Sequence, residues 1–259
     1  MPRKSPNPSE PDFEQRVIES FSKYVKTYDR HAQLQRSMAE RLATLIPHPF
    51  PHKILEIGCG TGVFTRHLLA RSPSIIILND IAPLMIDHLK NHLEVPSNSK
   101  FLVGNAERIQ IPIAKLIAGN AVFQWFQNPQ NTLQRFHSSL EKEGYLAFST
   151  FGPKTLEEFR RSAQFQGPTH LHSQKRWKTL LTQAGFELLT FQTEIRQIFF
   201  QNTLSLIKNL QQIGAAPLRI LKSGELRQLI RDYDREYSSS QGVYTNWELF
   251  YFFARKGTG

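Results

Sequence analysis

The chain of 259 residues contains a single cysteine, Cys59, and no long apolar run. One cysteine excludes an internal disulfide framework and a zinc site built from several cysteines, and it favours a reducing compartment. The densest apolar stretch, residues 75–78, is far shorter than the roughly 20 residues that a membrane-spanning helix needs. The basic, proline-rich first residues lack the apolar segment of a secretory signal. We therefore expect a cytoplasmic protein without a membrane span.

Acidic residues are scarce relative to basic ones. The sequence has 32 Lys and Arg against 22 Asp and Glu, a formal net charge of +10, and its 40% hydrophobic and 21% charged residues are typical of a globular chain. A positive balance predicts an acidic partner, which could be nucleic acid, a membrane surface or an acidic protein. The sequence shows no arginine-rich run, no basic stripe interleaved with aromatics and no basic amphipathic anchor, which disfavours nucleic acid and membrane.

Apolar strand patterns alternate with helical patterns from residue 53 to residue 151. The expected strands are 53–57, 75–78, 101–103, 116–118 with 121–123 after a break, and 145–151, and the expected helices are 63–70, 82–93 and 132–140. This alternation predicts an α/β protein with a Rossmann-like, doubly wound parallel sheet.

The flanking segments indicate how the chain is organised around this sheet. Prolines predict a disordered tail over 1–11, and a helical pattern that ends at two further prolines predicts an N-terminal helical cap over 12–50. The remaining expected elements are helices at 154–163, 176–184, 203–213 and 225–237 and strands at 186–191, 194–200 and 244–255. We assign residues 51–200 to the core with a lid segment near 153–178, 201–241 to a helical lid insertion, and 242–259 to the final core strand.

A glycine-rich turn follows the first strand, where the sequence reads EIGCGTG from Glu56. Glycines let a backbone turn tightly and approach a ligand, and the helix that follows offers free N–H groups. Asp80 ends the next strand, where an acid can accept hydrogen bonds from both hydroxyls of a ribose; the alternative is that it caps helix 82–93. The turn and the acid together predict a nucleoside-binding site.

The identity of the nucleoside depends on Glu56. The dinucleotide fingerprint is G-x-G-x-x-G, whereas this turn reads G-x-G-x-G with Glu56 two residues ahead of it. A carboxylate there would repel a pyrophosphate, but it suits an ammonium group such as the amino-acid end of S-adenosylmethionine. We therefore predict S-adenosylmethionine as the cofactor. Ile81 and Met85 could wall its adenine or belong to the core, and Cys59 is expected to be a small buried filler.

Three segments in order across residues 53–150, ILEIGCGTG, ILNDIAPLM and FLVGNAERIQIP, resemble the motif series of class I S-adenosylmethionine-dependent methyltransferases. That resemblance implies a seven-stranded sheet with one antiparallel edge hairpin, which the last three expected strands would supply. It also implies a set of cofactor-binding residues: Glu56, Gly58, Cys59, Gly60, Gly62, Asp80, Ile81, Met85, Asn105, Ala106 and Asn120.

Shorter segments are similar to the malonyl-carrier-protein O-methyltransferases of biotin synthesis. They are residues 28–35, 120–125, 155–159 and 209–215, with Gly242 and Tyr244 before the last strand. This resemblance implies methylation of the free carboxylate of a malonyl thioester on acyl-carrier protein, with Tyr28, Gln124 and Trp125 on the substrate side. Two alternatives stay open: another class I methyltransferase acting on a small acid, a quinone precursor or RNA, and a non-catalytic binding or assembly protein.

Four positions depart from the family pattern. Asn105 stands where an Asp usually accepts from the adenine amino group, Lys115 stands where strand four often begins with an Asp, Glu56 replaces a commoner Asp, and Val243 lies between Gly242 and Tyr244. These changes indicate a divergent member. They weaken the assignment of the substrate more than the assignment of the cofactor.

No general base is expected, because a malonyl carboxylate arrives ionised and the methyl donor is already activated. His170 and His172 are two residues apart and could share a metal, but exposed loop histidines without a metal are the preferred interpretation. The malonyl carboxylate needs a cation, and the basic side chains in the lid segment include Arg160, Arg161, Lys175, Arg176 and Lys178. These side chains could instead dock an acidic carrier protein or form a solvated surface.

Overall fold

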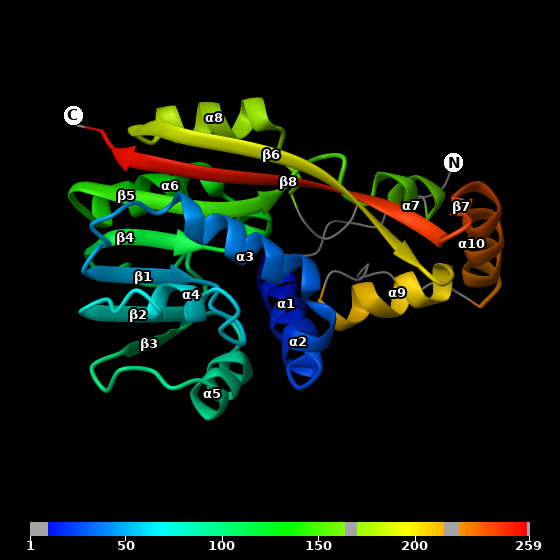
Figure 1. The fold of residues 1–259 in the computed structure, drawn as a ribbon, viewed down its shortest axis with the longest axis horizontal. Helices are drawn as coiled ribbons and strands as arrows, with labels where there is room; N and C mark the ends of the chain where they lie inside the picture. Colours follow the sequence, from blue (N-terminus) through cyan, green and yellow to red (C-terminus); the bar gives the residue numbers. More distant parts are fainter. Residues whose placement is uncertain (1–9, 164–169, 215–222, 258–259) are drawn as a thin grey trace.

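The computed structural model describes residues 10–163, 170–214 and 223–257. A twisted sheet runs through the molecule in the order β3-β2-β1-β4-β5-β8-β6, and the short β7 pairs with β8 (Figure 1). The strands are β1 Lys53–Ile57, β2 Ile75–Asp80, β3 Lys100–Val103, β4 Ala114–Gly119, β5 Leu140–Phe151, β6 Phe186–Phe200, β7 Ser238–Ser239 and β8 Gly242–Lys256. The first five are mutually parallel, and β8 is antiparallel to both β5 and β6. The predicted α/β class with an antiparallel edge hairpin is confirmed.

Helices cover both faces of this sheet. They are α1 Glu10–Tyr24, α2 Tyr28–His31, α3 Gln33–Leu45, α4 Thr65–Leu69, α5 Pro83–His92, α6 Pro129–Ser139, α7 Glu157–Ser162, α8 Gln174–Gln183, α9 Thr203–Gln212 and α10 Ser223–Glu236, with a 3₁₀ turn η1 at Phe123–Trp125. Successive residues of β1 point to opposite faces. Ile54 joins the apolar cluster that includes α3, α4 and α5, and Leu55 joins the cluster that includes α6 and α8. None of the helices in the described part of the chain has the length and apolar character to span a bilayer.

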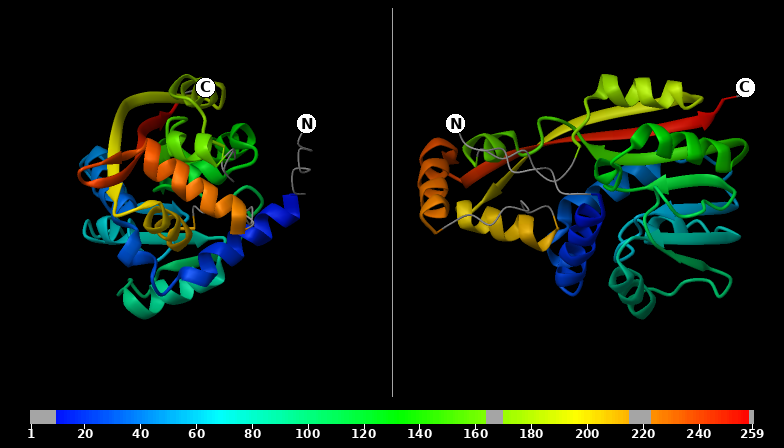
Figure 2. Two further views of the ribbon diagram at one scale, coloured as in Figure 1. Left: turned by 90° about the vertical axis from the view of Figure 1, so that its right-hand side faces the viewer. Right: turned by 180° about the vertical axis from the view of Figure 1, so that it is seen from behind.

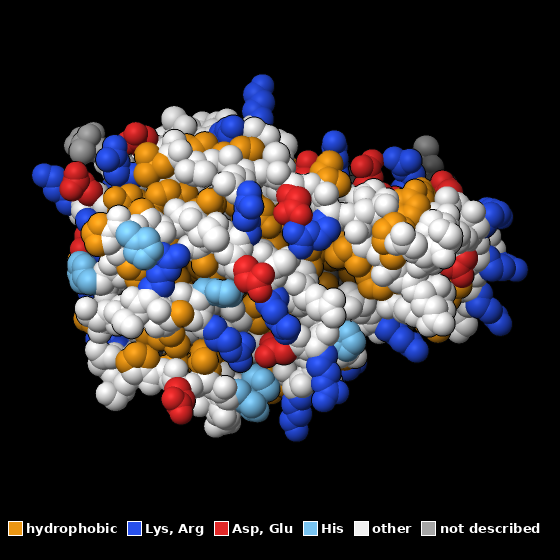
Figure 3. Space-filling view, viewed as in Figure 1, with side chains coloured by type: hydrophobic (Ala, Val, Ile, Leu, Met, Phe, Trp, Pro, Cys, Tyr) orange, Lys and Arg blue, Asp and Glu red, His pale blue; other side chains and the backbone are white. Residues whose placement is uncertain are grey.

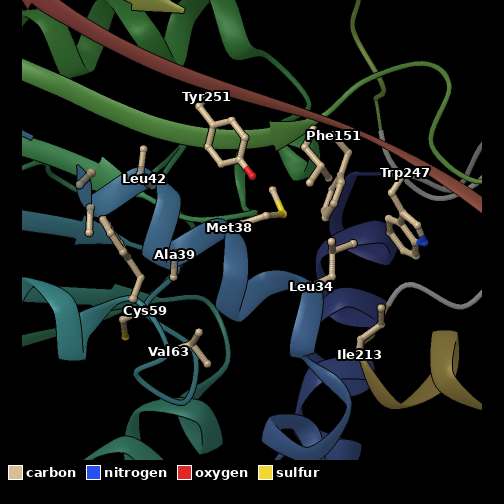
Figure 4. Packing of buried hydrophobic residues seen from close by; sticks show 14 of the residues in the cluster. Leu34, Met38, Ala39, Leu42, Cys59, Val63, Phe151, Ile213, Trp247 and Tyr251 are labelled. Atoms are coloured by element: carbon tan, nitrogen blue, oxygen red, sulfur yellow. The ribbon is translucent and has the colours of Figure 1, made fainter. Parts of the chain in front are cut away.

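Helix α3 carries the apolar stripe that its sequence predicts. Leu34, Met38 and Leu42 recur at every fourth position and are buried. Figure 4 shows this stripe between the glycine-rich turn at Cys59 and the strand residue Tyr251. The helix therefore fixes the turn against the far strands of the sheet.

The N-terminal helical cap expected over residues 12–50 consists of three helices. A turn at residues 25–27 separates α1 from α2, and Ala32, with φ −84° and ψ 36°, separates α2 from α3. Helix α1 begins at Glu10, so the disordered tail predicted over residues 1–11 does not include residues 10 and 11. Residues 1–9 lie outside the described part of the chain.

Two strand predictions were wrong. The segment 121–123 is not a continuation of β4, because Ala121 adopts φ +54° and turns the chain into η1. The segments 186–191 and 194–200 form one continuous strand, β6, with a register shift between Leu188 and Thr190. The polar residues Gln192 and Thr193 lie within this strand and pair with Tyr251 and Phe250 of β8.

The long β6–β8 pair extends beyond the core and carries helices at its far end (Figures 1 and 2). Leu206 of α9 and Tyr233 of α10 belong to the same apolar cluster as α3. The packing therefore joins the described part of the expected insertion to the core. The proposed domain limits stay a prediction, and residues 164–169 and 215–222 of the two lid segments lie outside the described part.

Gly242 begins β8 with φ +106°, and a Cβ there would collide with the carbonyl oxygen of Phe200. We expect Gly242→Ala to lower the free energy of unfolding by at least about 2 kcal/mol, because it adds an unfavourable φ to a backbone clash. Urea denaturation measures the change. Gly224→Ala is the control: a Cβ there meets nothing within 4 Å, and alanine is expected to be neutral or stabilising in helix α10. Equal stability of the two variants would contradict this account.

Candidate cofactor and substrate site

A cavity of about 350 Å³ opens at the carboxyl ends of β1, β2 and β4. In a parallel sheet this edge is where crossover loops leave room for a ligand. Most of the predicted cofactor contacts line it: Gly58, Gly60, Asp80, Ile81, Met85, Asn105, Ala106 and Asn120. The three predicted substrate residues, Tyr28, Gln124 and Trp125, line it too. The fold thus brings two predicted sets of residues to one cavity.

The glycine-rich turn presents its backbone to this cavity. Gly60 has φ +54°, and a Cβ there would meet nothing within 4 Å, so the space above the turn is open. By contrast, a Cβ at Gly58 would come within 2.6 Å of the side chain of Val122. Gly58 therefore allows close packing below the turn, while Gly60 allows a ligand to approach.

Asp80 connects the turn to the next helix. Its Oδ2 accepts from the Gly60 amide at 2.8 Å, and its Oδ1 accepts from the Ala82 amide at 2.9 Å. Burial raises the pKa of Asp80 to about 6, and the two amides oppose that rise. Each carboxylate oxygen has a second lone pair, so holding the turn and binding ribose hydroxyls are compatible roles. The ribose contact stays a prediction.

Asn105 follows β3 and also lines the cavity. Its Oδ1 accepts from the Glu107 amide at 2.9 Å, and its Nδ2 donates to Oε2 of Glu14 at 3.0 Å. The Oδ1 atom keeps capacity for one more donor, as an adenine amino group would require. The departure from Asp therefore leaves the required acceptor in place. Its additional donor is occupied by a residue of α1.

A third part of the cavity wall, formed by Gln35 and Asn120, fits an ammonium group. Gln35 of α3 is buried and lines the cavity, and its Oε1 has no hydrogen-bond partner among the described residues. The side chain of Asn120 donates to the Gln35 carbonyl at 2.9 Å and accepts from Ser149 at 2.7 Å, which fixes this wall. An unsatisfied buried acceptor is costly unless a ligand supplies a donor. The chemistry of this wall matches the amino-acid end of S-adenosylmethionine.

Three predicted cofactor contacts, Glu56, Cys59 and Gly62, do not line the cavity. Oε2 of Glu56 accepts from Thr65 at 2.8 Å beneath the turn, Cys59 is buried in the core, and a Cβ at Gly62 would press on Leu89. These residues support the turn from behind. The contact between Glu56 and the ammonium group of the cofactor stays a prediction.

Burial raises the pKa of Glu56 to about 8, with Asp80 adding to the rise and Thr65 opposing it. Glu56 is thus protonated in the folded protein at neutral pH. Its contribution to the free energy of unfolding is present below the unfolded-state pKa of 4.5 and is lost as the pH rises to about 8. We expect Glu56→Gln to melt above the wild type by a margin that grows between about pH 5 and about pH 8. Thermal melts at the two pH values measure this, and a constant margin would contradict it.

The end of the cavity lined by the predicted substrate residues is aromatic. The ring of Trp125 lies 5.5 Å from Phe21 and 6.4 Å from Phe13, centroid to centroid, and both partners belong to α1. Burial raises the pKa of Tyr28, and Asp80 and Asp29 raise it further, so its phenol stays neutral. The Gln124 amide is held by the Ala121 carbonyl and by Thr150. These two hydrogen bonds fix the Gln124 side chain in the cavity wall.

Several lining residues were not predicted from the sequence as site residues. They are Phe13, Val17 and Phe21 of α1, Gln35 of α3, Ile213 after α9 and Trp247 of β8. Arg160 of α7, one of the five basic lid residues named for the malonyl carboxylate, also lines the cavity. The apolar residues of α1 recur at every fourth position, a stripe that could have been recognised. Nothing in the sequence distinguishes Arg160 from its basic neighbours.

Arg160 places a cation in the wall of the cavity. Its Nε donates to the Thr155 carbonyl at 3.0 Å, and its Nη2 donates to the Pro153 carbonyl. Burial lowers its pKa, while Glu157 and Glu158 oppose that change, and a guanidinium stays charged at neutral pH. The two carbonyls fix the guanidinium plane, which suits recognition of a carboxylate.

The remaining sequence predictions lie outside the cavity. Lys115 donates to the Lys142 carbonyl at 2.7 Å near the amino end of β4, and Val243 is buried in the core. The rings of His170 and His172 are 6.1 Å apart. Within the described residues, no group of three or more His, Cys, Asp or Glu side chains could hold a metal ion.

Comparisons with known proteins find methyltransferases. The methyltransferase-domain family matches residues 28–190. Malonyl-acyl-carrier-protein O-methyltransferase 1 of Ilyobacter polytropus is 34% identical over 235 residues, covering 88% of this chain and 87% of its own. The corresponding enzyme of Bacteroides thetaiotaomicron is 31% identical, covering 93% and 97%. A putative methyltransferase structure from Bacillus halodurans superposes with a TM-score of 0.66 at 14% identity, covering 86% of this chain and 100% of its own.

Proposed function

This chain belongs to the methyltransferase-domain family, and on that premise we propose that it methylates the free carboxylate of a malonyl thioester carried by acyl-carrier protein. The observation that carries the proposal is one cavity with a glycine turn and Asp80 at one end and the fixed cation of Arg160 in its wall. The names of the similar enzymes support the same substrate. The methyl ester would mask the malonyl charge, so that fatty-acid enzymes accept the thioester as a primer in the synthesis of biotin.

The cofactor half of the cavity accounts for each part of S-adenosylmethionine, which supplies an activated methyl group when bound. Asp80 would accept from the ribose hydroxyls, and Asn105 would accept from the adenine amino group. Ile81 and Met85 would wall the adenine ring. The unpaired Oε1 of Gln35 would accept from the ammonium group.

The substrate half has to position and desolvate a carboxylate that is already ionised. Arg160 would hold one carboxylate oxygen and leave the other free to attack the methyl group. Trp247 lines the cavity with an indole N–H that has no partner among the described residues, and it is a second donor for the acyl group. Phe13, Phe21 and Trp125 exclude water. This arrangement needs no general base.

The surface does not favour the RNA alternative on the face seen in Figure 3. Lys and Arg side chains there are interspersed with acidic and apolar ones, and they form no continuous stripe. A nucleic-acid channel needs clustered positive charge. We place the protein in the cytoplasm, where an acyl-carrier protein would meet it.

Transfer of a labelled methyl group tests this function. We expect labelling of malonyl-acyl-carrier protein, with malonyl-coenzyme A and free malonate assayed alongside. Absence of product with all three acceptors would contradict the proposal. If the protein also failed to bind S-adenosylmethionine or its demethylated product, the cofactor assignment would fail with it.

A further inference from the structure

A second hollow lies on the outer side of the lid segment. It is lined by Lys154 before α7, by Lys175 and Lys178 of α8, and by Glu248 and Phe250 of β8. Helix α8 packs along β6 beside the antiparallel edge of the sheet, as Figure 2 shows. We call this hollow the basic groove.

The sequence of α8 divides this helix into two faces. Trp177, Leu180 and Leu181 are buried against the sheet. Lys175, Lys178, Thr179 and Thr182 recur at spacings of three and four and line the groove. An amphipathic helix thus turns a polar, basic ridge outward.

The basic groove carries a net positive charge that can interact with a partner. Three lysines face one acid, Glu248, whose Oε2 accepts from the backbone amide of Lys154 at 2.9 Å. The Lys178 ammonium lies 4.5 Å above the ring of Phe191. Among the residues that the structure describes, none of the three lysines forms an ion pair. An acidic partner would therefore have no ion pair to break at these lysines.

The basic groove and the active-site cavity share their wall. Pro153 and Lys154 line the groove, and the next residues, Thr155 and Leu156, line the cavity. The same alternation occurs in two other segments: Leu171 and Trp247 line the cavity, whereas Ser173 and Glu248 line the groove. Only one or two residues of the shared wall would separate a partner bound in the groove from the substrate end of the cavity.

We propose that the basic groove docks the acidic surface of the carrier protein, so that its acyl arm enters the cavity past residues 153–156 and 171–173. This inference rests on the proposed function. The lysines attract and orient the carrier, and Pro153 and Phe250 also line the groove. Methyl transfer itself stays in the cavity, beyond the wall.

A charge reversal separates docking from chemistry. The triple variant Lys154→Glu, Lys175→Glu, Lys178→Glu is expected to raise KM for malonyl-acyl-carrier protein at least about ten-fold, because exposed charges act chiefly on encounter. Its kcat/KM for malonyl-pantetheine, which has no carrier protein, should match the wild type. Raising the salt concentration should raise the KM of the wild type more than that of the variant.

The matched control reverses three exposed lysines elsewhere, Lys90→Glu, Lys100→Glu and Lys142→Glu. The first two lie on α5 and β3 at the opposite edge of the sheet, and the third lies at the start of β5. This variant has the same net charge and should keep the wild-type KM. An unchanged KM in the groove variant, an equal rise in the control, or an equal loss with malonyl-pantetheine would each overturn the docking proposal. If the wild type failed on both substrates, the proposed function itself would be at fault.

Discussion

Replacing Arg160 with methionine is expected to lower kcat/KM for a malonyl thioester by about 100-fold while leaving the affinity for S-adenosylmethionine unchanged. Charge-assisted hydrogen bonds are worth about 1.5–3 kcal/mol, and 1.4 kcal/mol corresponds to a factor of ten. Methionine keeps the length of the side chain and removes its donors. Steady-state kinetics with malonyl-acyl-carrier protein and calorimetry with the cofactor measure the two quantities.

Arg161 provides the control for this substitution. It is the next residue, it is exposed, and it pairs at 3.0 Å with Glu157 one helical turn earlier. Arg161→Met removes the same charge from α7 without reaching the cavity and should be close to wild type. Arg160→Lys should recover part of the loss, because it keeps the charge but not the planar guanidinium. If Arg160→Met and Arg161→Met behaved alike, Arg160 would not be the carboxylate anchor.

Asp80→Ala is expected to weaken cofactor binding between about ten- and 100-fold. The substitution removes the acceptor for ribose hydroxyls, and it also leaves the amides of Gly60 and Ala82 without the carboxylate that holds the turn. Titration calorimetry with S-adenosylmethionine gives the affinity, and circular dichroism checks that the variant is folded.

Asp87→Asn is a suitable control because Asp87 is exposed on the adjacent helix α5. Asp80→Asn should fall between the wild type and Asp80→Ala, since its amide oxygen can accept for only one of the two amides. Unchanged affinity in Asp80→Ala would show that the ribose site lies elsewhere.

The parallel half of the fold could be predicted because its signals are local. β1 and β2 are apolar runs ended by a glycine turn and by Asp80, and parallel pairing brings both ends to one edge. That single rule placed most of the predicted contacts in one cavity. The sequence could not show that Ala121 takes a left-handed conformation, because an apolar residue there fits a strand equally well.

The substrate half depends on contacts between distant segments, and sequence reasoning reached it only in part. Arg160 becomes distinct from Arg161 only when the carbonyls of Pro153 and Thr155 draw its side chain inward. Gln35 was recognised as part of a family segment, but its unpaired oxygen is a property of packing. The hydrogen bond between Glu56 and Thr65 is likewise a contact of packing, which the sequence does not show.

Intact-mass spectrometry of the carrier protein after incubation with S-adenosylmethionine tests the central claim most directly. The account predicts that malonyl-acyl-carrier protein gains the mass of one methylene group and that acetyl-acyl-carrier protein, which has no free carboxylate, gains nothing. A gain on the acetyl form, or no gain on the malonyl form by a protein that binds the cofactor, would contradict it.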